Sequence, residues 1–409
     1  MIGMKRNVSI LAVFLAVLAT LFVVERTLQR VAAEQAQGAP QAPRFEVDPL
    51  WPKPLPNHWL MGSTIGVWAD AQDQIWVIHR SSATLNNNEK GAELKPPIAE
   101  CCKGAPPVLV FDKAGNLVKS WGGPGTGYEW PSSNHGIFVD HKGNVWIGGN
   151  GAGDSQILKF TQDGKFLQQF GKANARRVGP AAPDAKFAGG SNDPSNFGRV
   201  AKIFVDAKTN KAFVADGYLN KRVAVLDADT GKLERAWGAY GNKPDDANPG
   251  PYSPSAPPAQ QFRNPVHCAD VSNDGFVYAC DRVNNRIQVF TREGKFVKEQ
   301  MLSKNTLAAG SVWDVAFSRD PQQRFLYIAD GQNQKVYILE RESLRHLTTF
   351  GDGGRQPGQF FGVHSIATDS QGNLYTTETY EGKRLQKFVY KGLGPVTKQE
   401  QGVLWPSSQ

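Results

Sequence analysis

The chain has 409 residues, of which 40% are hydrophobic and 21% charged, a composition too apolar for a disordered protein. Its 42 glycines and 26 prolines, beside 22 phenylalanines and 10 tryptophans, favour many short strands and turns over long helices. Four cysteines without CxxC spacing exclude a disulfide scaffold, a zinc knuckle and a CxxC redox site. The net charge of +8 fits a carboxylate ligand, an anionic envelope surface or solubility alone.

The N-terminus is predicted to be an export signal, because Lys5 and Arg6 precede an apolar run over residues 8–24. This run is long for a signal core and at the lower limit for a membrane-spanning helix, so a cleaved signal and an N-terminal membrane anchor both stay open. We assign residues 1–38 to this leader with its linker, 39–395 to one folded domain and 396–409 to a C-terminal tail. A periplasmic or extracellular location is expected.

One pattern recurs six times along the folded domain: a hydrophobic strand usually ending in Asp, a turn, and a second strand. The first strands are predicted at residues 65–70, 135–140, 201–206, 267–272, 313–318 and 364–369. Most units add third and fourth strands joined by hairpin turns such as Asp163-Gly164. Four strands in each of six units predict an all-β, six-bladed propeller of the NHL-repeat type. Two β-sandwiches, the alternative, would not keep this register through all six units.

The ring of blades has one gap and three insertions. The sixth unit lacks a clear fourth strand, and Phe45–Leu50 is predicted to supply it, so that an N-terminal strand closes the last blade. The insertions, at residues 81–107, 172–199 and 239–265, show no strand pattern and are expected to be loops.

Histidine occupies the first position of the first strand only in units two, four and six, at His135, His267 and His364. The first strands of a propeller line its central channel, and alternate blades of six stand about 120° apart. Three imidazoles are therefore predicted to converge on the axis as a metal site with an open position. Zinc is preferred over copper or iron, because all three ligands are imidazoles and nothing in the chain indicates redox function.

Arg80, Tyr218 and Arg282 each follow a second strand, which ends at the face where the first strands begin. They are predicted to lie near the histidines, together with the three insertions, at one opening of the channel. Taken singly, each arginine is also explained as a solvated or aspartate-paired strand end, and Tyr218 as a packing residue.

Over roughly residues 66–388 the chain resembles the peptidyl-α-hydroxyglycine α-amidating lyases. The matching segments are residues 75–80, 134–137, 215–218, 281–288 and 364–366. The resemblance implies zinc on His135, His267 and His364. It also implies catalytic roles for Tyr218 and Arg80, with Arg282 and Arg80 binding the substrate.

The activity implied by this resemblance is cleavage of a carbinolamide of the N-acyl-α-hydroxyglycine type to an amide and glyoxylate. Zinc would act as a Lewis acid on the substrate hydroxyl or carboxylate. Tyr218, near a dication and two arginines, is expected to have a pKa well below the usual value of about 10 and to remove the hydroxyl proton. Arg80 or Arg282 would bind the carboxylate through a bidentate pair.

The sequence departs from the family at a structural calcium site. The family holds calcium with backbone oxygens that match Val67 and Ile137, and with an aspartate directly after the last histidine. Here that position is Ser365, which leaves calcium open. Disulfides between Cys268 and Cys280 and between the adjacent Cys101 and Cys102 stay open as well.

Two other functions compete with the lyase. One is a non-catalytic NHL-repeat propeller that binds peptide or envelope partners. The other is a lactonase-type hydrolase, although such propellers hold their metal with Glu, Asp and Asn. The expected partner is a small molecule or peptide with a carboxylate. Nucleic acid is not expected, and contact with a membrane only through an N-terminal anchor.

Overall fold

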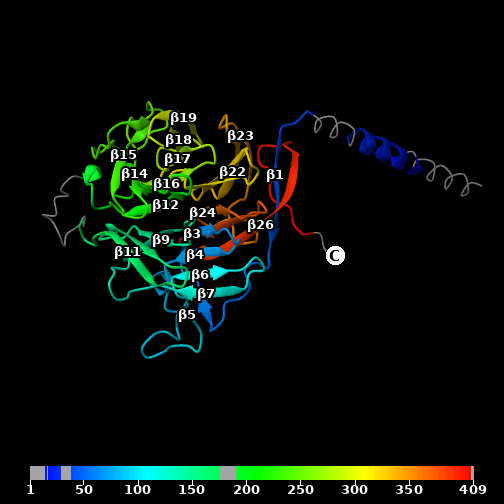
Figure 1. Ribbon diagram of the computed structural model, residues 1–409. Helices are drawn as coiled ribbons and strands as arrows, with labels where there is room; N and C mark the ends of the chain where they lie inside the picture. Colours follow the sequence, from blue (N-terminus) through cyan, green and yellow to red (C-terminus); the bar gives the residue numbers. More distant parts are fainter. Residues whose placement is uncertain (1–13, 16, 29–37, 176–189, 407–409) are drawn as a thin grey trace, which may run out of the picture.

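The computed structural model describes residues 14–15, 17–28, 38–175 and 190–406. Six four-stranded antiparallel sheets follow one another around a central channel (Figure 1). Their innermost strands contact each other in the cyclic order β3, β8, β12, β16, β20, β24 and back to β3. The predicted six-bladed, all-β propeller is therefore confirmed.

The blades are built in chain order from the inner strand outward. Blade one is β3 (Thr64–Ala69), β4 (Ile75–His79), β6 (Val108–Phe111) and β7 (Leu117–Trp121). Blade two is β8 (Asn134–Val139), β9 (Val145–Gly149), β10 (Gln156–Phe160) and β11 (Phe166–Gly171). Blade three is β12 (Val200–Asp206), β13 (Lys211–Asp216), β14 (Arg222–Asp227) and β15 (Leu233–Trp237).

The other three blades follow the same plan, except that the outermost strand of blade six comes from the N-terminal end of the domain. Blade four is β16 (Val266–Val271), β17 (Phe276–Asp281), β18 (Arg286–Thr291) and β19 (Phe296–Met301). Blade five is β20 (Asp314–Phe317), β21 (Phe325–Asp330), β22 (Lys335–Glu340) and β23 (His346–Phe350). Blade six is β24 (Val363–Thr368), β25 (Leu374–Glu378), β26 (Arg384–Pro395) and β1 (Gln41–Asp48).

The aspartate that ends most first strands fixes the turn to the second strand. In blade one, Oδ1 of Asp70 accepts hydrogen bonds from the backbone N–H groups of Gln72 and Gln74, at 2.9 and 2.8 Å. Its Oδ2 accepts from Nε1 of the buried Trp76, at 2.8 Å. Asp140 and Trp146 repeat this contact in blade two at 2.8 Å. One carboxylate thus joins turn and core, which explains the recurring pattern.

The last blade closes with the N-terminal strand, as predicted. Strand β1 pairs antiparallel with β26, and Val47 lies opposite Phe388. The strand begins at Gln41, four residues before the predicted Phe45, and it ends at Asp48 rather than Leu50. The C-terminal segment adds to this edge, because the backbone N–H of Leu404 donates to the carbonyl of Phe45 at 2.8 Å.

The expectation that the insertion at residues 81–107 contains no strand is wrong. It holds a 3-10 turn, η1 (Ser81–Thr84), and a short strand, β5 (Lys103–Gly104), which pairs in parallel with β2 (Trp59–Leu60). The insertion returns beside residues 58–60, and backbone N–H groups of the insertion donate hydrogen bonds to carbonyl oxygens of that segment. The other two insertions carry η2 (Gly190–Asn192) and η3 (Ala239–Gly241), and residues 176–189 lie outside the described chain.

Part of the leader is helical, over residues 14–15 and 17–28, and the rest of the predicted apolar run lies outside the described residues. Among the helices that the structure describes, none combines the length and the apolar character that a membrane crossing requires.

Candidate metal centre

The structure brings the three predicted histidines together on the channel axis. His135, His267 and His364 are the second residues of β8, β16 and β24, and none is more than 3% exposed. Their ring centroids lie 4.8–5.1 Å apart, and one nitrogen of each ring lies within 4.8 Å of the others. Three imidazole nitrogens from alternate blades converge on one point, a donor set that fits zinc.

A carbonyl oxygen of the following blade holds each imidazole. Nδ1 of His135 lies 2.7 Å from the oxygen of Ala201, Nδ1 of His267 2.5 Å from that of Trp313, and Nδ1 of His364 2.6 Å from that of Ile65. A carbonyl can only accept, so each Nδ1 carries the proton and Nε2 keeps a lone pair for a ligand. Such a bond fixes the tautomer and ring orientation of metal-binding histidines.

The three imidazoles are also kept neutral. Burial, together with the charges of Arg282 and Arg80, lowers the pKa of His364 to about 3. Burial likewise puts the pKa values of His135 and His267 well below the usual range, with the neighbouring His364 and an arginine adding to the effect. Metal ligation requires neutral imidazole, so the site is prepared for a cation at neutral pH.

Tyr218 lies directly over this cluster, two residues beyond the end of β13. Its hydroxyl is 3.0 Å from Nε2 of His135 and 2.9 Å from Nε2 of His267. A phenol has one proton, so it can satisfy at most one of these two acceptors. Burial raises the pKa of Tyr218, and Arg282 and Arg80 oppose this effect. The pKa well below 10 predicted from sequence is therefore not produced by the protein groups alone, because desolvation outweighs both arginines.

Both predicted arginines lie at the same opening. An Nη of Arg282 donates to the Tyr218 hydroxyl at 3.2 Å, and its guanidinium stacks on Trp313 at 4.4 Å from the ring centroid. An Nη of Arg80 donates to Asn150 at 3.0 Å. The Nε atoms of both arginines are buried without a hydrogen-bond partner. Within the described chain neither guanidinium pairs with a carboxylate inside 4.0 Å, so two positive charges stand uncompensated.

Sequence reasoning missed two residues of this opening. Asn150 follows β9 and binds Arg80, and Tyr380 follows β25, where its ring packs 6.3 Å from Trp313. Both occupy the second-strand ends that singled out Arg80, Tyr218 and Arg282. Extending that register to the remaining blades would have found them.

The residues proposed for calcium lie one and two positions farther along the first strands. The backbone N–H of Val67 donates to Oγ of Ser365 at 3.3 Å, and Ser365 donates to Asp314 at 2.7 Å. Ile137 lies close to Val67 and Ser365. Its backbone nitrogen is so near to Gly66 that a Cβ atom added to that glycine would lie only 3.0 Å from it. The structure also pairs Cys268 with Cys280 and Cys101 with Cys102, and no cysteine is free.

Fold and site together define a six-bladed propeller with three histidines in its channel that could hold a metal ion. No family model matches the sequence. The chain is similar to the peptidyl-glycine alpha-amidating monooxygenase B of Xenopus laevis, with 25% identity over 280 residues, covering 66% of this chain and 27% of that protein. It is also similar to NHL repeat-containing protein 3 of Mus musculus, with 22% identity over 316 residues, covering 75% of this chain and 69% of that one.

These similarities confirm the resemblance to amidating enzymes and NHL-repeat propellers. The chain spans about a quarter of the length of the amidating monooxygenase that it matches. Among solved structures, a catalytically inactive virginiamycin B lyase from Staphylococcus aureus superposes with a TM-score of 0.45 and 13% identity, covering 89% of this chain and 94% of that one.

Proposed function

We propose that the protein is a zinc-dependent carbon–nitrogen lyase that cleaves an N-acyl-α-hydroxyglycine to an amide and glyoxylate. The observation that carries this proposal is the pairing of three neutral imidazoles with two half-buried arginines that have no carboxylate partner within 4.0 Å in the described chain. A site of this charge favours an anionic substrate. The α-hydroxy acid offers a carboxylate for the arginines and a hydroxyl for the metal centre.

The arginines bind and orient the substrate. A guanidinium presents parallel N–H donors that match both oxygens of a carboxylate. In the described chain the Nε donors of Arg80 and Arg282 have no hydrogen-bond partner and could bind a substrate. The guanidinium of Arg282 lies over the Trp313 ring, 4.4 Å from its centroid, and this contact limits the directions in which it can donate. A zinc ion on the three Nε2 atoms would supply Lewis acidity to the substrate hydroxyl.

Tyr218 moves the proton. In its ionised form the phenolate oxygen accepts the hydroxyl proton while the C–N bond breaks. The carbon then becomes the aldehyde of glyoxylate, the bonding pair stays on nitrogen, and the proton taken up by Tyr218 passes to that nitrogen to complete the amide. Arg282 and Arg80 favour the phenolate electrostatically, while burial opposes it.

The acyl portion of the substrate has a place beside this opening. An open pocket of about 780 Å³ is lined by Leu219 and Val283, the residues directly after Tyr218 and Arg282. Lys221 and Arg263 also line it, beside Asp246, and in the described chain the donors of these two cations meet only carbonyl or amide oxygens. These two cations favour an acyl group with an acidic end.

We further propose that the protein works outside the cytoplasm, in the periplasm or extracellular space, where its two disulfides would be stable. The charged, apolar leader supports export. A small molecule or peptide with a carboxylate is the proposed partner, and the N-terminal segment is the only proposed point of contact with a membrane.

The test is a glyoxylate-release assay on N-acyl-α-hydroxyglycines with metal analysis of the same preparation. Release that requires stoichiometric zinc supports the lyase. Zinc-loaded protein that releases no glyoxylate from neutral, acidic or basic N-acyl-α-hydroxyglycines would contradict it. That result would favour a non-catalytic binding propeller. The similarity to an NHL repeat-containing protein supports this second candidate.

A further inference from the structure

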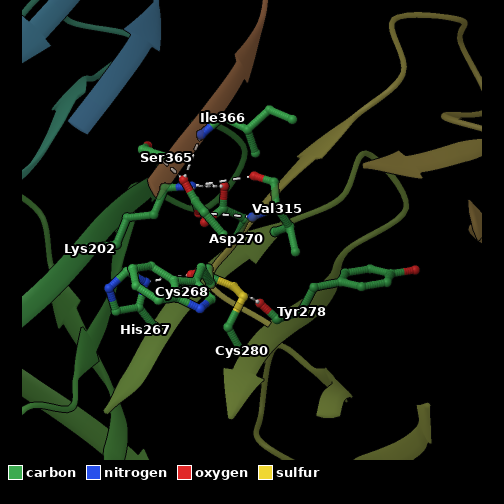
Figure 2. Close-up of a disulfide and its surroundings, with 11 residues drawn as sticks. Lys202, His267, Cys268, Asp270, Tyr278, Cys280, Val315, Ser365 and Ile366 are labelled. Carbon is green, nitrogen blue, oxygen red and sulfur yellow. Dashed lines mark hydrogen bonds and ion pairs between the residues drawn. A yellow bond between two sulfur atoms is a disulfide. The ribbon is translucent and has the colours of Figure 1, made fainter. Parts of the chain in front are cut away.

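A buried ammonium group lies on the channel wall beneath the three histidines. Lys202, on β12, is 6% exposed, and its Nζ is 2.8 Å from Oδ2 of Asp270 and 2.6 Å from Oδ1 of Asp314. It also donates to the carbonyl oxygen of Val315 at 3.4 Å. The three partners come from blades four and five, so Lys202 joins three neighbouring blades (Figure 2).

These contacts are the ones that a bound cation would make. Two carboxylates and a backbone carbonyl are oxygen ligands typical of a calcium site. Val315 lies two positions beyond Trp313 in the first strand, the same register as Val67 and Ile137 in their blades. Leaving two buried carboxylates without a partner is strongly unfavourable, and here the ammonium supplies the compensating charge.

Ser365 completes this arrangement as a donor rather than a ligand. Its Oγ donates to Oδ2 of Asp314 at 2.7 Å, and the backbone N–H of Ile366 donates to the same oxygen at 3.1 Å. Asp314 is thereby bound on both oxygens. A carboxylate at position 365 would place a second negative charge against Asp314, so the serine suits a channel that carries its own cation.

Among the residues that the structure describes, nearby groups offer no alternative site for a divalent metal. Cys268 lies close to Asp270 and Asp314, but its sulfur is bonded to Cys280, as Figure 2 shows, and a disulfide sulfur is not a thiolate ligand. A cavity of only about 10 Å³ is bounded by the histidines on one side and by Lys202, Asp314 and Ser365 on the other.

We propose that Lys202 is the resident cation of the channel and replaces a second, structural metal ion. The protein then binds one metal, at His135, His267 and His364, and no calcium on the axis. The calcium that the family resemblance implies does not fit these residues. The stability and the metal content of the channel can both be measured whether or not the protein is a lyase.

The first test uses the full-length wild-type protein, with metal analysis and thermal unfolding in EGTA and in millimolar Ca²⁺. The expected result is no calcium above background and the same Tm in both conditions. A stoichiometric calcium that is lost in EGTA together with a drop in Tm would overturn the proposal, whatever the glyoxylate assay shows.

The second test transplants the cation site. Lys202→Met combined with Ser365→Asp removes the ammonium and supplies a third carboxylate beside Asp270 and Asp314. This variant should gain Ca²⁺ binding, seen as a rise in Tm of about 3–5 °C at Ca²⁺ well above its Kd. A folded double variant whose Tm ignores Ca²⁺ would count against the proposal. If it fails to fold, the wild-type measurement decides.

The matched control is Lys159→Met. Lys159 is also 6% exposed and lies on a strand. Its Nζ, however, donates to the carbonyl of Ala228 and lies over the Trp146 ring, and it is not ion-paired with a carboxylate in the described chain. Removing this ammonium leaves no acidic pair, so the Tm of Lys159→Met should not respond to Ca²⁺. A Ca²⁺ response equal to that of the double variant would overturn the assignment.

Discussion

Nδ1 of His364 lies 2.6 Å from the carbonyl oxygen of Ile65, so a histidine of the last blade is oriented by the first blade. His135 and His267 are oriented in the same way by Ala201 and Trp313. The blades without histidine therefore contribute to the site as well. They supply the acceptors that leave each Nε2 free to bind a metal.

Metal content should depend on each histidine. The purified protein is expected to contain about one zinc, and alanine at His135, His267 or His364 should reduce occupancy at least about 10-fold, because two imidazoles hold zinc much more weakly than three. His141→Ala, at an exposed turn, is the control and should retain zinc. Elemental analysis after dialysis measures this. Full occupancy in any of the three channel variants would remove that residue from the metal centre.

Tyr218→Phe should lower kcat about 100-fold or more, the usual contribution of a general base. The ring and its packing are retained, so zinc content and KM should change little. Tyr390→Phe, on β26 and outside the channel, should have wild-type kcat. A Tyr218→Phe enzyme with unchanged turnover would leave the metal centre intact but exclude the phenol from the reaction.

Arg282→Lys and Arg80→Lys should raise KM about 10-fold, since lysine keeps the charge but loses the planar pair of donors that fits a carboxylate. Arg292→Lys is the comparison, because this arginine already pairs with Asp206 at 2.7 Å. Steady-state glyoxylate release distinguishes these cases. A KM that is indifferent to both substitutions would show that the carboxylate binds elsewhere.

The metal-free protein should lose stability on mild acidification. Burial lowers the pKa of His364 to about 3, whereas the unfolded chain has a value of about 6.5. Between these values the unfolded chain binds a proton that the folded protein does not, so the free energy of unfolding rises with pH up to 6.5. Acidification from pH 6.5 to 5 should cost about 2 kcal/mol at this residue. Urea unfolding measures the slope, which should become smaller in His364→Gln and stay unchanged in His141→Gln.

Substrates with an acidic acyl end should bind better than neutral ones, and Arg263→Leu should remove this preference. In the described chain the Arg263 guanidinium donates only to uncharged oxygens, those of Asn284, Gly250 and Pro249, so its charge is available to a ligand in the adjoining pocket. The ratio of kcat/KM for acidic and neutral substrates measures the effect. Lys243→Met, an exposed residue of the same insertion, is the control. A ratio that survives Arg263→Leu would place the acyl group outside this pocket.

The sequence predicted the blades and the convergence of the three histidines because both depend on local register. The turn between the first and second strands has a recognisable sequence pattern. An aspartate closes the turn and accepts a hydrogen bond from an aromatic side chain at the second position of the next strand, as Asp70 and Trp76 show. The histidines repeat at one position relative to that pattern, so their convergence follows from the symmetry of the ring.

The Lys202 cluster was not predictable in this way. Lys202 follows Ala201 in a strand, where a lysine is usually exposed, and its partners Asp270 and Asp314 lie 68 and 112 residues away. Such a contact depends on which blades are neighbours and on how far a long side chain reaches across the channel. The low pKa expected of Tyr218 depends on a metal dication as well as on the arginines and stays a prediction, but the opposing effect of burial was not predictable for a related reason. Its desolvation depends on the packing of the whole opening, which no local pattern records.

Blade six is made from both ends of the domain, with β1 paired to β26 and Leu404 bonded to Phe45 and Val47. The two ends of the folded chain therefore emerge from the same blade. A circular permutant that links them and opens the chain at the exposed turn of residues 141–142 would keep every strand pairing of the ring. The fold therefore requires that the blades be neighbours around the channel, and it does not require that they follow one another in a particular order from the first residue of the chain.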